Sequence, residues 1–316
     1  MIHQASKPKA HHHPSLIMSC GFVLTAVHLD PQIAWDAIRA AEYEIRRIEA
    51  LISSWKEDSQ TSRINKCSGM QAVSVDQELF DLIERSIKVS HLTCGAFDIS
   101  GTLARYYWNF NKSDSVWLEQ DKIEELRFLI NYNNIELDHG KRSVYLANKG
   151  MKIGFGGIGK GYAAQRAKKI MMDHGILDGM INASGDLLCW GNPPDSRDWK
   201  INIPDPRNRQ LNLLEVSLDS GSVVTSGCYE SYTIIEGQRY SHIINPQTGT
   251  PVTHTKNVSV VSPDAEFGDA IATALSVLPI DEGLGLVDQL KGVECIIIDA
   301  EDNAHFSEQL KSQAYA

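Results

Sequence analysis

Residues 153–170 read IGFGGIGKGYAAQRAKKI, with five glycines in the first nine positions and a helix-like pattern after them. From Gly154 to Gly159 the glycines satisfy G-x-G-x-x-G, the pattern of dinucleotide-binding turns. The same stretch nearly satisfies the P-loop pattern through Lys160, but Gly161 stands where that pattern needs Ser or Thr. Both patterns predict that backbone amides cradle phosphate here.

Neither standard fold that uses these patterns accounts for the flanking sequence. A dinucleotide-binding unit carries an acidic residue at the end of its second strand, and here that strand runs into INASGDLLCWG (181–191) without such an acid. A P-loop holds Mg²⁺ with the hydroxyl that Gly161 lacks. What remains is a strand end, glycine amides, Lys160 and a helix N-terminus, which together predict an anion site. A tight strand–helix turn that uses glycine for close packing is the alternative.

The order of the remaining elements favours an α+β fold. Apolar spacing predicts helices early in the chain, and strands accumulate later without regular β-α-β alternation. The expected helices are 34–52, 76–92, 121–130, 161–174, 267–278 and 281–291. The expected strands are 22–29, a hairpin over 135–148, 179–183, most of 199–261, and 293–299, while 53–69 and 95–110 are expected to be loops.

Composition limits the class of protein. Hydrophobic residues make up 42% and charged residues 22% of 316, as in soluble globular proteins. The net charge of −10 argues against nucleic acids and anionic membranes as partners. No apolar stretch approaches the length of a membrane span, so no stable membrane insertion is expected.

Residues 1–15 are expected to be a disordered leader or expression remnant, and residues 16–316 a single domain. The six cysteines are far apart and form no C-x-x-C pair, which predicts free thiols in a reducing compartment. The expected location is therefore cytoplasmic, or periplasmic or membrane-anchored if an export leader has been removed.

Other segments carry candidate chemistry. Asp269 and Thr273 are four residues apart, so a helix presents both oxygens on one face, as a hard cation such as Mg²⁺ requires. A helix-capping Asp with an unrelated Thr is the alternative. His242 lies between a strand and the turn NPQTG, where it is either a general base or a structural histidine. Asp186, in NASGD, fits hydrogen bonding at a turn as well as it fits catalysis.

Taken in order, seven segments resemble the ApbE family of flavin transferases. They are SSWKEDSQTSRIN (53–65), FDISGTL (97–103), GFGGIGKGYAAQRA (154–167), INASGDLLCWG (181–191), TSGCYE (225–230), RYSHIINPQTGTPV (239–252) and SVVSPDAEFGDAIATAL (259–275). The resemblance implies an ApbE-like α+β fold of two interleaved lobes with FAD in the cleft between them. It also implies an FAD:protein FMN transferase that uses Mg²⁺, cleaves the FAD pyrophosphate, joins FMN to a Thr or Ser of a target protein and releases AMP.

The resemblance also implies roles for single residues. Asp269, Thr273 and the carbonyl of Gly157 correspond to the Mg²⁺ ligands. His242, Asp269 and Lys160 are the expected catalytic residues, with His242 the candidate base. The residues expected to contact FAD are Met18, Trp55, Ala96, Phe97, Asp98, Gly154, Lys160, His242 and Ile243.

This chain departs from the family at two positions. Gly154 stands where many relatives carry an acid, and Ser19 follows Met18 where glycine is usual. Two other functions use the same residues: an FAD pyrophosphatase giving FMN and AMP, and an FAD-binding protein without catalysis.

Overall fold

A computed structural model of the chain describes residues 7–108, 117–205, 208–227, 232–235 and 238–314. Its centre is an eight-stranded sheet in the order β1-β2-β6-β7-β10-β15-β16-β17, and every neighbouring pair is antiparallel. The strands are β1 (Lys9–Ile17), β2 (Cys20–His28), β6 (Asp178–Ala183), β7 (Asp186–Trp190), β10 (Ser220–Gly227), β15 (Thr255–Ser262), β16 (Glu294–Asp299) and β17 (Ala304–Phe306). This topology excludes the parallel sheet of a dinucleotide-binding fold.

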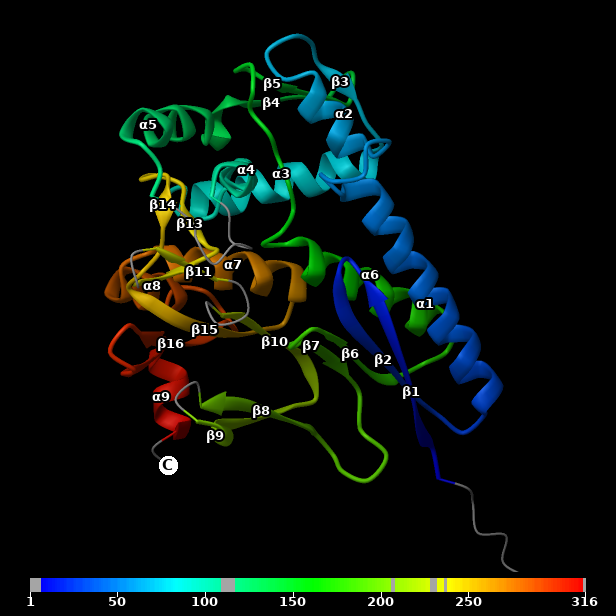
Figure 1. Cartoon of the computed structure of the whole chain (residues 1–316). Helices are drawn as coiled ribbons and strands as arrows, with labels where there is room; N and C mark the ends of the chain where they lie inside the picture. Colours follow the sequence, from blue (N-terminus) through cyan, green and yellow to red (C-terminus); the bar gives the residue numbers. More distant parts are fainter. Residues whose placement is uncertain (1–6, 109–116, 206–207, 228–231, 236–237, 315–316) are drawn as a thin grey trace, which may run out of the picture.

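Helices cover one face of the sheet and a hairpin covers the other (Figure 1). Three helices, α1 (Pro31–Ile52), α6 (Gly159–Asp173) and α7 (Ala265–Val277), pack on the first face and enclose the larger apolar core. On the second face a smaller core lies under β8 (Trp199–Asp205), β9 (Asn208–Leu218) and α9 (Glu308–Ala314). Helix α8 (Ile280–Val287) follows α7 and contacts β16.

A second lobe is inserted between α1 and α6. It contains α2 (Gln60–Lys66), α3 (Gln77–Leu92), η1 (Ile99–Leu103), α4 (Ala104–Tyr107), α5 (Gln120–Leu129), η2 (Tyr132–Asn134) and a small sheet of β3 (Val73–Ser74), β5 (Ser143–Leu146) and β4 (Ile135–Asp138). The later hairpins are β11 (Tyr232–Ile235) with β12 (Gln238–Ser241), and β13 (Ile244–Asn245) with β14 (Thr250–Pro251).

The two lobes are interleaved because the β13–β14 hairpin, late in the chain, reaches the inserted lobe (Figure 1). The indole N–H of Trp108 donates to the carbonyl of Gly249 at 2.9 Å, and Arg127 Nε donates to the carbonyl of Gln247 at 2.8 Å. The predicted α+β fold with interleaved lobes is therefore confirmed.

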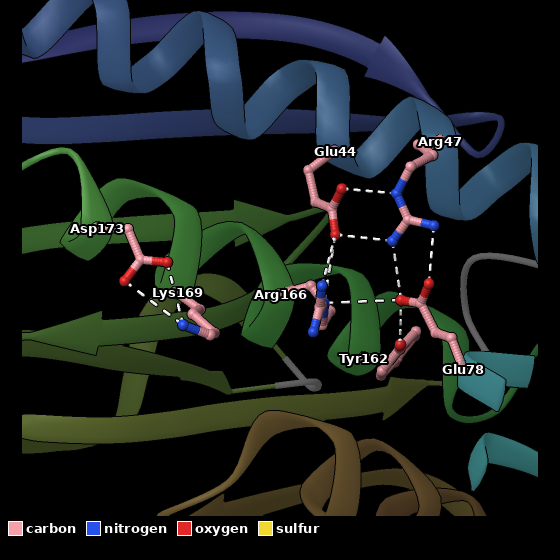
Figure 2. A network of polar contacts seen from close by, with 7 residues as sticks. All are labelled: Glu44, Arg47, Glu78, Tyr162, Arg166, Lys169 and Asp173. Carbon is pink, nitrogen blue, oxygen red and sulfur yellow. Dashed lines mark hydrogen bonds and ion pairs between the residues drawn. The ribbon is translucent and has the colours of Figure 1, made fainter.

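Polar contacts fix α6 against its neighbours. Figure 2 shows Glu44 and Arg47 of α1, Glu78 of α3, and Tyr162 and Arg166 of α6 in one network. Arg47 binds both glutamates at 2.7–2.8 Å, and Arg166 donates to Glu44 at 3.1 Å. The network is partly buried and joins α6 to both α1 and α3, so it helps to fix the position of α6 against these helices.

The expectation of a disordered segment over residues 1–15 is wrong for residues 9–15. They belong to β1, which pairs with β2 from Lys9↔His28 to Ile17↔Cys20. Side chains add to the backbone pairing: His12 Nδ1 lies 2.9 Å from Thr25 Oγ1, and His13 Nε2 lies 2.9 Å from Glu42. Polar composition concealed this strand, although its partner β2 follows directly after the turn at Met18 and Ser19. Residues 1–6 lie outside the described part.

Other local predictions also needed correction. The expected loop 53–69 contains α2, because Ser59 caps it by accepting from the amide of Ser62 at 2.9 Å. The expected loop 95–110 contains η1 and α4, and its last two residues lie outside the described part. The predicted strand end before the glycines is absent: residues 147–158 form no strand, and Asn65 instead binds the amide and the carbonyl of Ile153, at 2.7 and 2.9 Å.

Within the described residues, no helix has both the length and the apolar character needed to cross a bilayer.

Candidate active site

A pocket of about 210 Å³ lies where the two lobes meet. The inserted lobe provides one wall through residues 96–105, the glycine loop 154–160 provides another, and β10, the segment 242–246 and α7 complete it. Pockets that enclose drug-sized ligands typically measure ~300–1,000 Å³. A dinucleotide would therefore extend beyond this pocket. A second cavity of about 510 Å³ adjoins it and shares Asp98 and Pro246 with it.

The glycine loop approaches its neighbours too closely for side chains. The amide of Gly154 donates to the carbonyl of Ile99 at 3.0 Å, which ties the loop to the inserted lobe. A Cβ added to Gly157 would lie 2.6 Å from Thr273 Oγ1, and one added to Gly161 would lie 2.1 Å from the carbonyl oxygen of Ala265. Glycine at these positions lets α6 start directly against α7.

Helix α7 brings a carboxylate and a hydroxyl to this contact. Asp264 caps the helix by accepting from the amide of Phe267 at 2.8 Å, and Asp269 and Thr273 follow on the face that lines the pocket. Asp269 is 2% exposed, and its Oδ2 accepts from the amide of Gly161 at 3.0 Å. Among the described residues, no cationic side chain forms an ion pair with it.

A buried carboxylate without a cationic partner is a feature of metal sites, because an unpaired buried charge is costly. The described residues contain no cluster of three or more His, Cys, Asp or Glu side chains that could hold a metal ion. Mg²⁺ does not need such a cluster, since it binds one or two carboxylates and keeps waters and substrate oxygens as its other ligands. The donor set of Asp269 and Thr273 therefore fits Mg²⁺.

Lys160 forms an ion pair with Asp186. Asp186 begins β7 after a tight turn in which Ser184 and Gly185 have φ values of 57° and 101°. Its other oxygen accepts from the amide of Thr225 on β10 at 2.9 Å. Asp186 thus connects the sheet to the cation of the glycine loop, which places the NASGD turn beside the site.

Asp98 lies on the boundary of the two cavities. Its Oδ1 accepts from the amide and hydroxyl of Ser100 at 2.7 Å, and its Oδ2 accepts from the amide of Tyr132 at 2.8 Å. Burial raises the pKa of this carboxyl to about 6, while the hydrogen bonds to Ser100 and Tyr132 act in the opposite direction. The side chain holds the inserted lobe around the pocket through these bonds.

The structure brings ten of the twelve predicted site residues to this pocket. They are Ala96, Phe97, Asp98, Gly154, Gly157, Lys160, His242, Ile243, Asp269 and Thr273. Met18 and Trp55 do not line it. Met18 donates its amide to Glu49 at 3.0 Å, and Trp55 is 64% exposed and stacks on Tyr106 with ring centres 5.1 Å apart. The roles of all twelve remain predictions.

The lining residues outside the predicted set include Thr102 and Arg105. A Cβ added to Gly154 would lie 2.6 Å from Thr102 Oγ1, so Thr102 occupies the space that a side chain at 154 would need. Arg105 lies on α4, in a segment rich in apolar and aromatic residues. A single positively charged residue within such a segment was the sequence signal that could have identified Arg105.

Comparisons with known proteins agree on one family. The sequence model described as the ApbE family matches residues 18–297. An FAD:protein FMN transferase of Buchnera aphidicola (subsp. Schizaphis graminum) is 31% identical over 73% of this chain and 69% of the relative. One of Treponema pallidum is 29% identical over 80% of this chain and 74% of the relative.

Solved structures give the same result. The ApbE protein of Thermotoga maritima superposes with a TM-score of 0.89 at 28% identity, covering 96% of this chain and 99% of that one. The flavinyl transferase ApbE of Pseudomonas stutzeri superposes with a TM-score of 0.87 over 99% of both chains, and at 22% identity it supports the fold alone.

Proposed function

The chain belongs to the ApbE family, and from this premise we propose that it is an FAD:protein FMN transferase. The family match over residues 18–297 carries the proposal. The geometry supports it, because one pocket collects glycine amides, the Lys160 cation, the buried Asp269 and His242. These are the groups that a phosphoryl-type transfer needs to bind and stabilise negative charge.

In the proposed reaction a Thr or Ser hydroxyl of a target protein attacks the FMN-side phosphorus of FAD. A new P–O bond to the acceptor forms, the bridging P–O bond breaks, and AMP leaves with the bridging oxygen. The glycine amides and Lys160 stabilise the charge that develops on the phosphate oxygens. His242 accepts the proton of the attacking hydroxyl, as a histidine does near neutral pH.

We propose that Asp269, Thr273 and the carbonyl of Gly157 hold Mg²⁺. The close approach of Gly157 to Thr273 supports this assignment, as does the absence of a cationic partner for Asp269 among the described residues. A bound Mg²⁺ supplies Lewis-acid stabilisation of a diphosphate.

Incubation with FAD, Mg²⁺ and an acceptor protein tests the function. We expect the acceptor to gain the mass of FMN with one AMP released per acceptor. AMP without labelled acceptor would indicate the pyrophosphatase, provided that a second acceptor also stays unlabelled. If FAD binds but stays intact, the chain is an FAD-binding protein without catalysis and the mechanism is refuted.

The metal proposal has its own test. Asp269→Asn retains the hydrogen bond to Gly161 through its amide oxygen but removes the charge. We expect turnover to fall at least about 100-fold at ordinary Mg²⁺ and to recover partly at high Mg²⁺. Full activity of Asp269→Asn at low Mg²⁺ would remove this residue from the metal site.

Four cysteines that the structure describes, Cys67, Cys94, Cys189 and Cys295, are free thiols. They support a reducing, cytoplasmic location, which we offer as a proposal together with the acceptor protein as partner.

A further inference from the structure

The cations that line the pocket differ in how their charge is compensated. Lys160 is paired with Asp186, so its ammonium already has a carboxylate partner. Arg105 lines the same pocket, and within the described part of the chain its guanidinium forms no ion pair. Arg105 is therefore the lining cation whose full charge is available to an anionic ligand.

Arg105 also lies next to the glycine loop. A Cβ built on Gly156 would lie 3.8 Å from Arg105 Nη1, so the guanidinium borders the space beside this glycine. The guanidinium and the loop amides consequently face one region of the pocket. Positive groups on two sides of one space are the arrangement that binds a diphosphate.

The neighbours of Arg105 hold its helix in place. The next residue, Tyr106, stacks on Trp55 with an interplanar angle of 23°, and Lys152 lies with its Nζ 4.6 Å from the Tyr106 ring centre. Two residues further on, the Trp108 indole donates to the carbonyl of Gly249. These contacts anchor α4 while the Arg105 side chain remains exposed at the pocket.

We propose that Arg105 binds the diphosphate of FAD directly, as a second substrate-binding cation in the pocket that Lys160 also lines. This inference rests on the proposed function for the identity of the ligand. Guanidinium has a planar set of donors that fits two phosphate oxygens at once, which an ammonium group does not provide. Because the diphosphate is charged before and during the reaction, Arg105 acts mainly on binding. Its loss raises the KM for FAD more than it lowers kcat.

Equilibrium binding of FAD without Mg²⁺ and without acceptor tests the inference independently of turnover. Arg105→Gln is expected to weaken FAD binding about 10- to 100-fold at low salt, the range for losing a hydrogen bond to a charged group. The difference between wild type and Arg105→Gln should shrink at 0.5 M NaCl, where charges are screened. Arg105→Lys should lie between the two, since it keeps the charge but loses the planar donors.

Arg197→Gln is the matched control, because Arg197 is also exposed and lies in the loop between β7 and β8, outside the pocket lining. If Arg105→Gln binds FAD with a Kd within twofold of the wild-type value, the inference is overturned. An equal loss at low and high salt would also overturn it, by showing a packing role. If the wild type binds FAD but releases no AMP, the proposed function fails while the effect of Arg105 on binding is still measured.

Discussion

The contact between α6 and α7 at Gly161 gives a sharp test of how the site is assembled. In Gly161→Ala the new Cβ would lie 2.1 Å from the carbonyl oxygen of Ala265 and 3.0 Å from Asp269 Cβ. Ordinary contact begins at 3.4 Å, so the Ala265 carbonyl must move by 1.3 Å, the difference between 3.4 and 2.1 Å. That carbonyl is backbone in the first turn of α7, so the helix has to move with it.

The cost follows from three contributions. Overpacking a close contact costs about 1–3 kcal/mol, and losing the bond from the Gly161 amide to the buried Asp269 costs about 1–3 kcal/mol more. Alanine regains up to about 1 kcal/mol over glycine in a helix. The net loss of unfolding free energy should be about 1–5 kcal/mol. A misplacement of about 1 Å costs on the order of 100-fold in rate, so kcat/KM should fall by that factor.

Urea unfolding and FAD-dependent AMP release measure the two effects on one preparation. Gly285→Ala is the control: it lies inside α8, nothing stands within 4 Å of its added Cβ, and it should gain up to about 1 kcal/mol. A Gly161→Ala protein with wild-type stability and activity would refute the close packing of α6 on α7 as the basis of the site.

Three further changes test other contacts. Asp186→Asn keeps an acceptor for the Thr225 amide but removes the ion partner of Lys160. In the AMP-release assay kcat should therefore fall about tenfold, while Tm changes little. An unchanged kcat would show that the ion pair does not position Lys160 for the reaction. Burial raises the pKa of Asp98 from 3.8 to about 6 in the folded chain, so the folded state binds this proton more tightly and stability falls as pH rises from about 4 to 6. Asp98→Asn should flatten that part of the pH–stability curve in urea unfolding, and an unaltered slope would exclude Asp98 as its source. Ile45→Ala, at a fully buried position, should cost 2–5 kcal/mol in the same assay, whereas Ile33→Ala on the same helix, 38% exposed, should cost under about 1 kcal/mol.

The sequence predicted those elements whose structure depends on local spacing. The apolar repeat of α1 is confirmed over Pro31–Ile52, with Asp30 capping it by accepting from the amide of Gln32. The hairpin of β4 and β5 is confirmed as well. In contrast, β1 was missed although it pairs with the adjacent β2, because its polar sequence KAHHHPSLI shows no strand pattern.

The part of the site that the sequence predicted consists of residues that belong to recognisable short motifs. Asp269 and Thr273 line one pocket, as their spacing on one helix face predicted, and the glycine loop joins them there, as the family resemblance implied. The ion pair of Lys160 with Asp186 joins residues 26 positions apart, and hydrogen bonds of the NASGD turn alone cannot reveal it. Arg105 was missed because its contribution depends on where α4 lies relative to the glycine loop.

The near-match to a P-loop has a physical explanation in the packing of α6 and α7. A Ser or Thr at position 161 would place its Cβ against the carbonyl of Ala265, so this fold cannot carry the P-loop hydroxyl there. Helix α7 instead presents a hydroxyl from the other side, where Thr273 lies directly against Gly157. If Thr273 takes over that ligand role, Thr273→Val should weaken Mg²⁺-dependent activity about tenfold while Thr273→Ser retains most of it. Equal activity of the two variants across a Mg²⁺ titration would show that the hydroxyl only packs against the glycine loop.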